Sequence, residues 1–223
     1  MPEYPYVAIE GAIGVGKTTL ARLIQQDFNA ELLLEVFEEN PFLGDFYADR
    51  EKYAFQTQIY FLLSRYQQQH RVIQEIIGRS PLISDYTFAK DRLFARLNLR
   101  GDELALYEQV HAVLATRIPL PSLIVFLRAD TDVLMERIAF RDRPYERDMD
   151  RDYIDNVRMA YEHFFGDYDR APVLAIDTNS MNFVRNPQHL RSIVGQIRAA
   201  LDVGMYQLNL PRSGRLNEAS EIV

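Results

Sequence analysis

A glycine-rich loop near the N-terminus carries the clearest chemical signal in the sequence. It satisfies the pattern G-x-x-x-x-G-K-[ST] and lies between an apolar run and an amphipathic stretch, which is the strand-to-helix setting of a phosphate loop. Its glycines let backbone N–H groups turn toward phosphate oxygens, Lys17 can reach the outer phosphates, and Thr18 can hold Mg²⁺. We therefore predict that ATP is bound by Gly11, Ala12, Ile13, Gly14, Val15, Gly16, Lys17, Thr18 and Thr19.

The phosphate loop identifies the nucleotide but not the group that accepts the phosphate. A guanine-specific switch GTPase would normally carry an N-K-x-D segment, and the sequence has none. A mechanical ATPase would normally end a strand in two acids, whereas here Asp85 is followed by Tyr86. These features favour a small-molecule kinase.

Carboxylates at the ends of two predicted strands are candidates for the chemistry, because ligands of open α/β sheets lie beyond the carboxyl ends of the strands. Glu35 could orient an acceptor hydroxyl and take its proton. Glu38 and Glu39 follow closely, so the pattern favours Glu35 without excluding them. Asp85 could bind Mg²⁺ opposite Thr18, or it could simply cap a helix.

Four arginines, Arg137, Arg141, Arg143 and Arg147, lie within the segment "RIAFRDRPYER" of a chain whose net charge is -7. One interpretation is a solvated helix face with ion pairs to neighbouring acids. The other is a lid over ATP. Arg137 and Arg141 share a helix face, while Pro144 disfavours helix at Arg143, so the helix should end near Arg141. We predict that Arg137, Arg141 and Arg143 act on the transferring phosphate and that Arg147 is an ordinary surface charge.

Apolar runs that alternate with helical patterns must position these residues. Strands are predicted at 6–10, 31–37, 81–85, 122–128 and 173–177, and helices at 17–28, 41–49, 52–77, 102–117, 131–141, 150–165 and 187–202. This order indicates an α/β P-loop kinase fold, with a five-stranded parallel sheet flanked by helices and a short arginine-rich lid at about 137–150. We expect one domain over 1–203 and a polar tail over 204–223.

Composition excludes several classes of protein. The chain has no cysteine, so a disulfide framework, a thiolate metal site and a cysteine nucleophile are impossible. Its acidic balance argues against a nucleic-acid partner. The N-terminus has no leader pattern and no apolar run reaches membrane-spanning length, so we expect no membrane partner and a cytoplasmic location.

The order of the motifs resembles the deoxynucleoside kinase family, and within it the bacterial deoxyguanosine/deoxyadenosine kinase branch. The resemblance is carried by "IEGAIGVGKTT", "LLEVFEENPFLGDFY", "FQTQIYFLLSRY", "ISDYTFAKDRLFA" and "RIAFRDRPYER", in this order. It implies ATP- and Mg²⁺-dependent 5'-phosphorylation of a purine deoxyribonucleoside in nucleotide salvage, with deoxyguanosine the first choice and deoxyadenosine the second. It also implies a homodimer.

The resemblance assigns roles to individual residues. Glu35 corresponds to the catalytic carboxylate, and Tyr47 and Glu146 to the pair that holds the sugar 3'-hydroxyl. Gln58 would bind the base edge, and Arg65 and Asp91 match base-proximal residues of some members. Because Gln58 and Arg65 are spaced i, i+7, they share one helix stripe, about 10 Å apart; the plainer alternative for Arg65 and Asp91 is a polar surface.

The sequence departs from the commonest pattern of this family after the third predicted strand. Many members carry Glu-Arg-Ser there, with the arginine steadying the catalytic carboxylate, whereas this chain has Asp85, Tyr86 and Thr87. The Asp-Tyr pair is similar to the deoxyguanosine kinase side of the branch, so both residues join the predicted substrate site. Tyr86 cannot supply a positive charge, which leaves the steadying role without a residue.

Two other functions remain open. A nucleoside monophosphate kinase of the thymidylate kinase type would share the loop and the lid but would need further cations for its acceptor phosphate. A regulatory module that binds ATP without transferring phosphate would need no acceptor-side carboxylate, so Glu35 and Asp85 argue against it.

Overall fold

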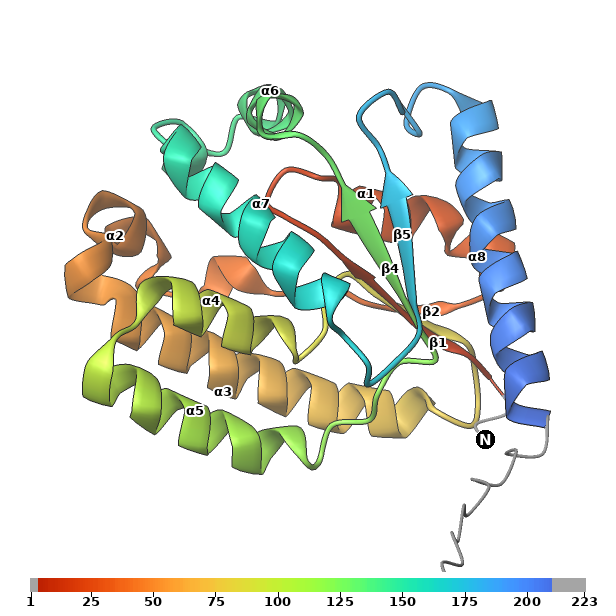
Figure 1. The fold of residues 1–223 in the computed structure, drawn as a ribbon, viewed down its shortest axis with the longest axis horizontal. Coiled ribbons are helices and arrows are strands. Elements are labelled where there is room, and N and C mark those ends of the chain that lie inside the picture. Colours follow the sequence, from red (N-terminus) through yellow and green to blue (C-terminus); the bar gives the residue numbers. More distant parts are fainter. Residues whose placement is uncertain (1–3, 210–223) are drawn as a thin grey trace, which may run out of the picture.

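The computed structural model describes residues 4–209, and its centre is a parallel sheet of five strands. The strands lie in the order β2-β3-β1-β4-β5, and all neighbours are parallel (Figure 1). Their bounds are β1 Tyr6–Glu10, β2 Glu31–Leu33, β3 Leu82–Ser84, β4 Leu123–Arg128 and β5 Val173–Asp177. The carboxyl ends of the strands therefore meet at one edge, where the predicted site residues follow β1, β2 and β3.

Helices cover both faces of the sheet. They are α1 Lys17–Ile24, α2 Leu43–Ala48, α3 Arg50–Ile76, α4 Lys90–Asn98, α5 Gly101–Ala115, α6 Thr131–Arg141, α7 Arg151–Gly166 and α8 Pro187–Asn209. The 3-10 turns Gln26–Phe28, Phe37–Glu39 and Pro144–Glu146 complete the described elements. In Figure 1, α8 flanks one side of the sheet, and α3, α4, α5 and α7 lie on the other. None of the described helices is long and apolar enough to cross a membrane.

The central strands form because their side chains are buried on both faces, as a sheet covered on both sides requires. All five residues of β1 are buried. Tyr6 and Ala8 belong to a cluster with Ile73 of α3, whereas Val7 and Ile9 belong to the cluster that includes α1. The alternation of a strand thus distributes β1 between two layers of core.

The long helix α3 begins with a cap that its sequence provides. The Asp49 side chain accepts a hydrogen bond from the backbone N–H of Lys52, at 3.2 Å, so the helix starts at Arg50 and not at residue 52. Its buried stripe includes Leu62 and Ile73, whereas Leu63, which the helical spacing also predicts to be in the core, is 51% exposed.

Two further predicted boundaries were wrong, and one helix was missed. The second strand ends at Leu33, not at residue 37, because beyond it the chain bonds to the side chain of Asp85 and not to the sheet. Helix α4 was missed, since its buried face carries Lys90 and Asp91, which a hydrophobic pattern assigns to the surface. The last helix continues to Asn209, past its predicted end at residue 202; residues 210–223 of the predicted tail lie outside the described part.

Candidate active site

The phosphate loop joins β1 to α1 in a conformation that depends on glycine. Gly14 has φ +88°, and a Cβ atom there would lie 2.8 Å from Cγ1 of Ile138 and from the carbonyl oxygen of Leu134. A side chain would thus meet both an unfavourable backbone region and helix α6. The loop is therefore packed directly beneath the first turns of the arginine-bearing helix.

Lys17 is folded over its own loop. Its Nζ atom donates to the carbonyl oxygens of Gly11, at 2.7 Å, and Ala12, at 3.1 Å. Burial, followed by repulsion from Lys90, lowers the pKa of Lys17 to about 8. A phosphate arriving at the loop would supply the negative charge that this ammonium lacks.

Thr18 and Asp85 meet across the site, as the prediction of a shared magnesium ligand pair requires. The Thr18 hydroxyl donates to Oδ2 of Asp85. The other carboxylate oxygen of Asp85 accepts a hydrogen bond from the backbone N–H of Glu35 at 2.8 Å. Asp85 therefore links the phosphate loop to the segment after β2 by hydrogen bonds. Hydroxyl and carboxylate oxygens fit Mg²⁺, which takes few protein ligands and relies on phosphates and water for the rest. Residues 4–209 contain no cluster of three or more acidic, histidine or cysteine side chains that could hold a metal ion.

Glu35 is held by two cations. Its Oε1 accepts from Nε of Arg65 at 2.8 Å, and its Oε2 accepts from Nζ of Lys90 at 2.6 Å. Burial alone would raise the pKa of Glu35, but Arg65 and then Lys90 lower it to about 2. The carboxylate is therefore fully ionised at neutral pH and suited to accepting a hydrogen bond from a substrate hydroxyl.

Gln58 and Arg65 line the other end of the site, and Asp91, predicted to lie near the base, contacts Arg65 from outside the cavity lining. Arg65 forms an ion pair with Asp91, and its guanidinium lies 4.3 Å from the ring centre of Phe61. Asp91 is fully buried, so it is not the surface acid that the sequence left open; it contacts Arg65 and fixes that side chain. Within the described part of the chain, Oε1 of Gln58 and Oδ2 of Asp91 have no hydrogen-bond partner. Unpaired buried acceptors are costly, and because Gln58 lines the cavity, its Oε1 is a candidate for contact with a donor of a ligand.

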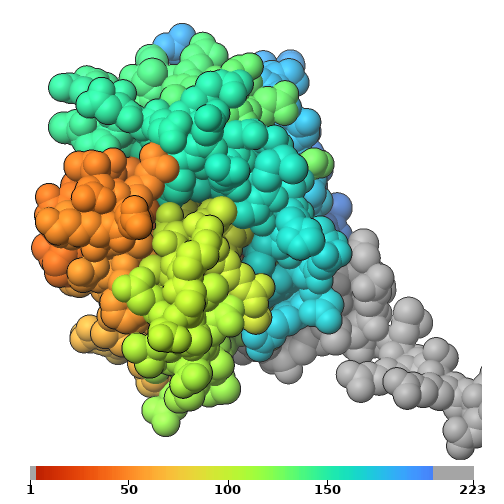
Figure 2. All heavy atoms as spheres, turned by 60° about the vertical axis from the view of Figure 1, so that its left-hand side comes forward, coloured from red at the N-terminus to blue at the C-terminus, as the bar shows by residue number. Residues whose placement is uncertain are grey.

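Tyr47 and Glu146, the predicted sugar-binding pair, line the same cavity. Tyr47 of α2 stacks on Tyr145, with ring centres 6.1 Å apart. Arg50 reaches across to Asp150 at 3.4 Å and lies over the ring of Tyr153. Figure 2 shows the α2 segment, in orange, lying against the teal segment of the lid and α7. The lid is thus closed onto α2.

The lid arginines differ in their contacts. Arg141 pairs with Glu146, while Arg143 lies over the ring of Phe37 and 3.7 Å from Glu146. Helix α6 ends at Arg141, as Pro144 predicted, and Arg147 forms an exposed pair with Asp142, as expected of a surface charge.

Arg137 makes a different set of contacts from the one predicted. Its Nη1 donates to the carbonyl oxygen of Val15 at 3.2 Å and to the hydroxyl of Thr178 at 3.0 Å; Nη2 donates to the carbonyl oxygens of Thr178 and Met181. Four of the five N–H groups of a guanidinium are therefore used. In this structure Arg137 ties the phosphate loop to the segment after β5, and a role on phosphate would require these bonds to break.

Tyr86 departs from its predicted place in the substrate site. It is fully buried, lies outside the cavity lining, and donates from its hydroxyl to Oε1 of Gln68 at 2.6 Å. Its neighbour Lys90 does line the cavity. Sequence reasoning missed Lys90 because nothing in its spacing separates it from a surface lysine.

The cavity that joins these groups measures about 120 Å³ and is lined by Lys17, Thr18, Glu35, Tyr47, Gln58, Arg65, Asp85, Lys90, Arg141, Arg143 and Glu146, among others. Ligand pockets usually measure about 300–1,000 Å³. The cavity is therefore too small for the predicted nucleoside, whose binding would require the contacts between the lid and α2 to loosen.

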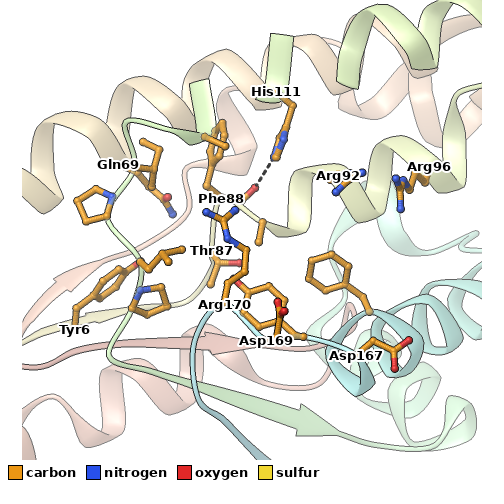
Figure 3. Close-up of a pocket in the computed structure, with 18 of the residues that line it drawn as sticks. Tyr6, Gln69, Thr87, Phe88, Arg92, Arg96, His111, Asp167, Asp169 and Arg170 are labelled. Carbon is orange, nitrogen blue, oxygen red and sulfur yellow. Dashed lines mark hydrogen bonds between the residues drawn. The ribbon is translucent and has the colours of Figure 1, made fainter. Parts of the chain in front are cut away.

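A larger cavity of about 330 Å³ lies on the other side of α4. Figure 3 shows Arg92, Arg96 and Arg170 around it, together with Asp167 and Asp169. Arg92 and Arg96 also contact Glu108. The three arginines are therefore balanced in number by three acids, namely Asp167, Asp169 and Glu108. Because this cavity has no excess of positive charge, we place the phosphate chemistry in the smaller cavity.

Comparisons with known proteins show which family this chain matches. Residues 7–202 match the family described as deoxynucleoside kinase. A deoxyguanosine kinase of Bacillus subtilis (strain 168) is 32% identical over 87% of this chain and 96% of its own. A deoxyadenosine kinase of Dictyostelium discoideum is 34% identical over 99% of this chain and 90% of its own.

The fold also has solved counterparts. A structure of deoxyadenosine kinase from M. mycoides, with the products dCMP and a flexible dCDP bound, superposes with a TM-score of 0.76 at 24% identity. The match covers 87% of this chain and 99% of that one. At this identity the likeness shows a common fold.

Proposed function

Since this chain belongs to the deoxynucleoside kinase family, we propose that it transfers the γ-phosphate of ATP to the 5'-hydroxyl of a purine deoxyribonucleoside, with deoxyguanosine preferred and deoxyadenosine second. The observation that carries the proposal is the position of Glu35. Its carboxylate lines the same closed cavity as the phosphate-loop residues Lys17 and Thr18 and the base-side residues Gln58 and Arg65.

The residues divide the reaction between them. Glu35 accepts the hydrogen bond of the 5'-hydroxyl and orients its oxygen toward the phosphate; with a pKa of about 2, it aligns the nucleophile more than it removes a proton early. Lys17, Arg141 and Arg143 stabilise the charge on the phosphate oxygens. Mg²⁺, when held by Thr18 and Asp85, would neutralise further charge on the phosphates. Tyr47 and Glu146 hold the 3'-hydroxyl.

The choice of base rests on the partners that Arg65 and Gln58 offer. A guanidinium pairs well with the O6 and N7 acceptors of guanine. The unpartnered Oε1 of Gln58 is an acceptor for a base N–H donor. Adenine would instead present its exocyclic amino group, a donor, where guanine has O6, so Arg65 favours guanine. The deoxyguanosine kinase of B. subtilis and the deoxyadenosine kinase of D. discoideum support a purine substrate for this chain.

The competing acceptor is a nucleoside monophosphate. Incubating the protein with ATP, Mg²⁺ and either deoxyguanosine or dTMP, and separating the products by ion exchange, distinguishes the two. We expect dGMP to form and dTMP to remain unchanged. Consumption of dTMP alone would overturn the proposal in favour of a thymidylate-kinase-like reaction, and ATP binding without transfer to either would favour the regulatory module.

We also propose a homodimer packed through helices. The support is the resemblance, together with Leu106 and Val113 of α5, which are at least half exposed and share a stripe at i, i+7. Sedimentation equilibrium is expected to give twice the mass of 26.0 kDa. A monomer at micromolar concentration would contradict the proposal.

A further inference from the structure

We propose that Lys90 is a positioning residue for Glu35: from the start of α4 it supplies one of the two positive charges that fix the orientation of this carboxylate. The inference rests on the proposed function, in which Glu35 aligns the acceptor hydroxyl.

The two carboxylate oxygens of Glu35 bind different partners. Arg65, on α3, takes Oε1 through Nε at 2.8 Å and Nη2 at 2.5 Å. Lys90, on α4, takes Oε2 at 2.6 Å. Two contacts from two different helices fix the plane of a carboxylate, whereas Arg65 alone would leave Oε2 free to turn.

The location of Lys90 is unfavourable for stability. Its side chain is only 4% exposed, and it opens a helix, where the positive end of the helix dipole repels a cation. A lysine in such a place lowers stability unless its partner compensates, and Glu35 already has Arg65. Residues held at such a cost are typical of functional sites.

The aromatic ring of Tyr86 lies next to the positive charge of Lys90 but carries no charge itself. Nζ of Lys90 lies 5.3 Å from the ring centre of Tyr86. The Tyr86 hydroxyl is bonded to Gln68, whose Nε2 donates to the carbonyl oxygen of Leu34 at 2.9 Å. The ring beneath Lys90 and the backbone next to Glu35 are thus held by one glutamine of α3, so the lysine and its carboxylate share a support.

Other charges face this pair from every neighbouring element. They are Arg65 from α3, Asp91 from α4, Asp85 after β3, Lys17 from α1 and Glu10 at the end of β1. Lys90 contributes to lowering the pKa of Glu35, and after burial it is the main cause that lowers the pKa of Lys17. Burial raises the pKa of Glu10, and Lys90 opposes that shift. Lys90 therefore influences the ionisation of both the acceptor side and the ATP side.

The test compares Lys90→Met and Lys90→Gln, which remove the charge, with Lys90→Arg, which keeps it. Lys52→Met, at an exposed lysine of α3, is the matched control. For each variant, kcat and the KM values for deoxyguanosine and for ATP are measured, with the melting temperature by circular dichroism. Phosphoryl transfer by the wild type is measured first, since its absence would reject the proposed function and not the role of Lys90.

We expect both neutral variants to lower kcat at least tenfold with little change in the KM for ATP, and Lys90→Arg to recover most of the rate. The melting temperature shows whether each variant is folded, since removing one partner of a buried ion pair is itself destabilising. Neutral variants with the wild-type kcat would overturn the proposal. So would an equal loss of kcat in all three variants, which would indicate a packing role.

Discussion

Nη2 of Arg141 lies 2.6 Å from both carboxylate oxygens of Glu146, five residues further along the lid. The resemblance assigns these two side chains to different parts of the substrates, the arginine to phosphate and the acid to the sugar. In the structure they neutralise each other, so the roles proposed for them require this ion pair to be exchanged for contacts with ATP and the nucleoside.

Removing either lid arginine should slow phosphoryl transfer. Arg141→Ala and Arg143→Ala are each expected to lower kcat by tenfold or more, about 1.4 kcal/mol of transition-state stabilisation. Steady-state rates at saturating ATP measure this loss.

Arg147→Ala is the matched control for these variants, because Arg147 lies on the same lid but pairs with Asp142 in solvent. It should keep the wild-type rate, since exposed pairs contribute little. Wild-type rates from Arg141→Ala and Arg143→Ala as well would return the whole segment to a surface role.

Glu35→Ala should separate ATP binding from turnover. The proposed ATP site is the phosphate loop and does not include this carboxylate, so calorimetric titration is expected to give near wild-type affinity while kcat falls at least a hundredfold. Glu38→Ala and Glu39→Ala change exposed carboxylates of the same segment and should leave kcat unchanged. Full activity in Glu35→Ala would remove Glu35 from the mechanism.

The lowered pKa of Lys17 predicts a basic limit for ATP capture. The protonated form is nearly complete below about pH 7, is halved at the pKa of about 8, and is lost at higher pH. The value of kcat/KM for ATP should therefore fall above pH 8, while kcat falls at higher pH because bound phosphate favours the charged lysine. A kcat/KM profile that stays flat to pH 10 would contradict this assignment.

Gly14→Ala should destabilise the protein and the phosphate loop together. The new methyl would meet Ile138 and Leu134 at a φ of +88°, so we expect a loss of roughly 1–3 kcal/mol in the free energy of unfolding, and weaker ATP binding. Gly44→Ala is the control: no atom lies within 4 Å of its added Cβ, and alanine favours helix, so this change should be neutral or stabilising. Urea denaturation measures both.

The sequence predicted what depends on pattern and missed what depends on packing. The glycine spacing located the phosphate loop, and strand ends located Glu35 and Asp85, because parallel strands bring their carboxyl ends to one edge. No local rule indicates that Lys90 is buried or that Arg137 bonds to backbone carbonyls, since both contacts join segments far apart in the chain. For the same reason Tyr86 was placed in the substrate site, although it fills the core beneath it.

The central claim is tested most directly by kcat/KM for the four deoxyribonucleosides, each measured with radiolabelled ATP and Mg²⁺. The proposed pairing of Arg65 and Gln58 with guanine predicts the highest value for deoxyguanosine, a lower one for deoxyadenosine, and at least tenfold lower values for both pyrimidines. Preferential phosphorylation of thymidine or deoxycytidine, or no transfer to any of the four, would contradict it.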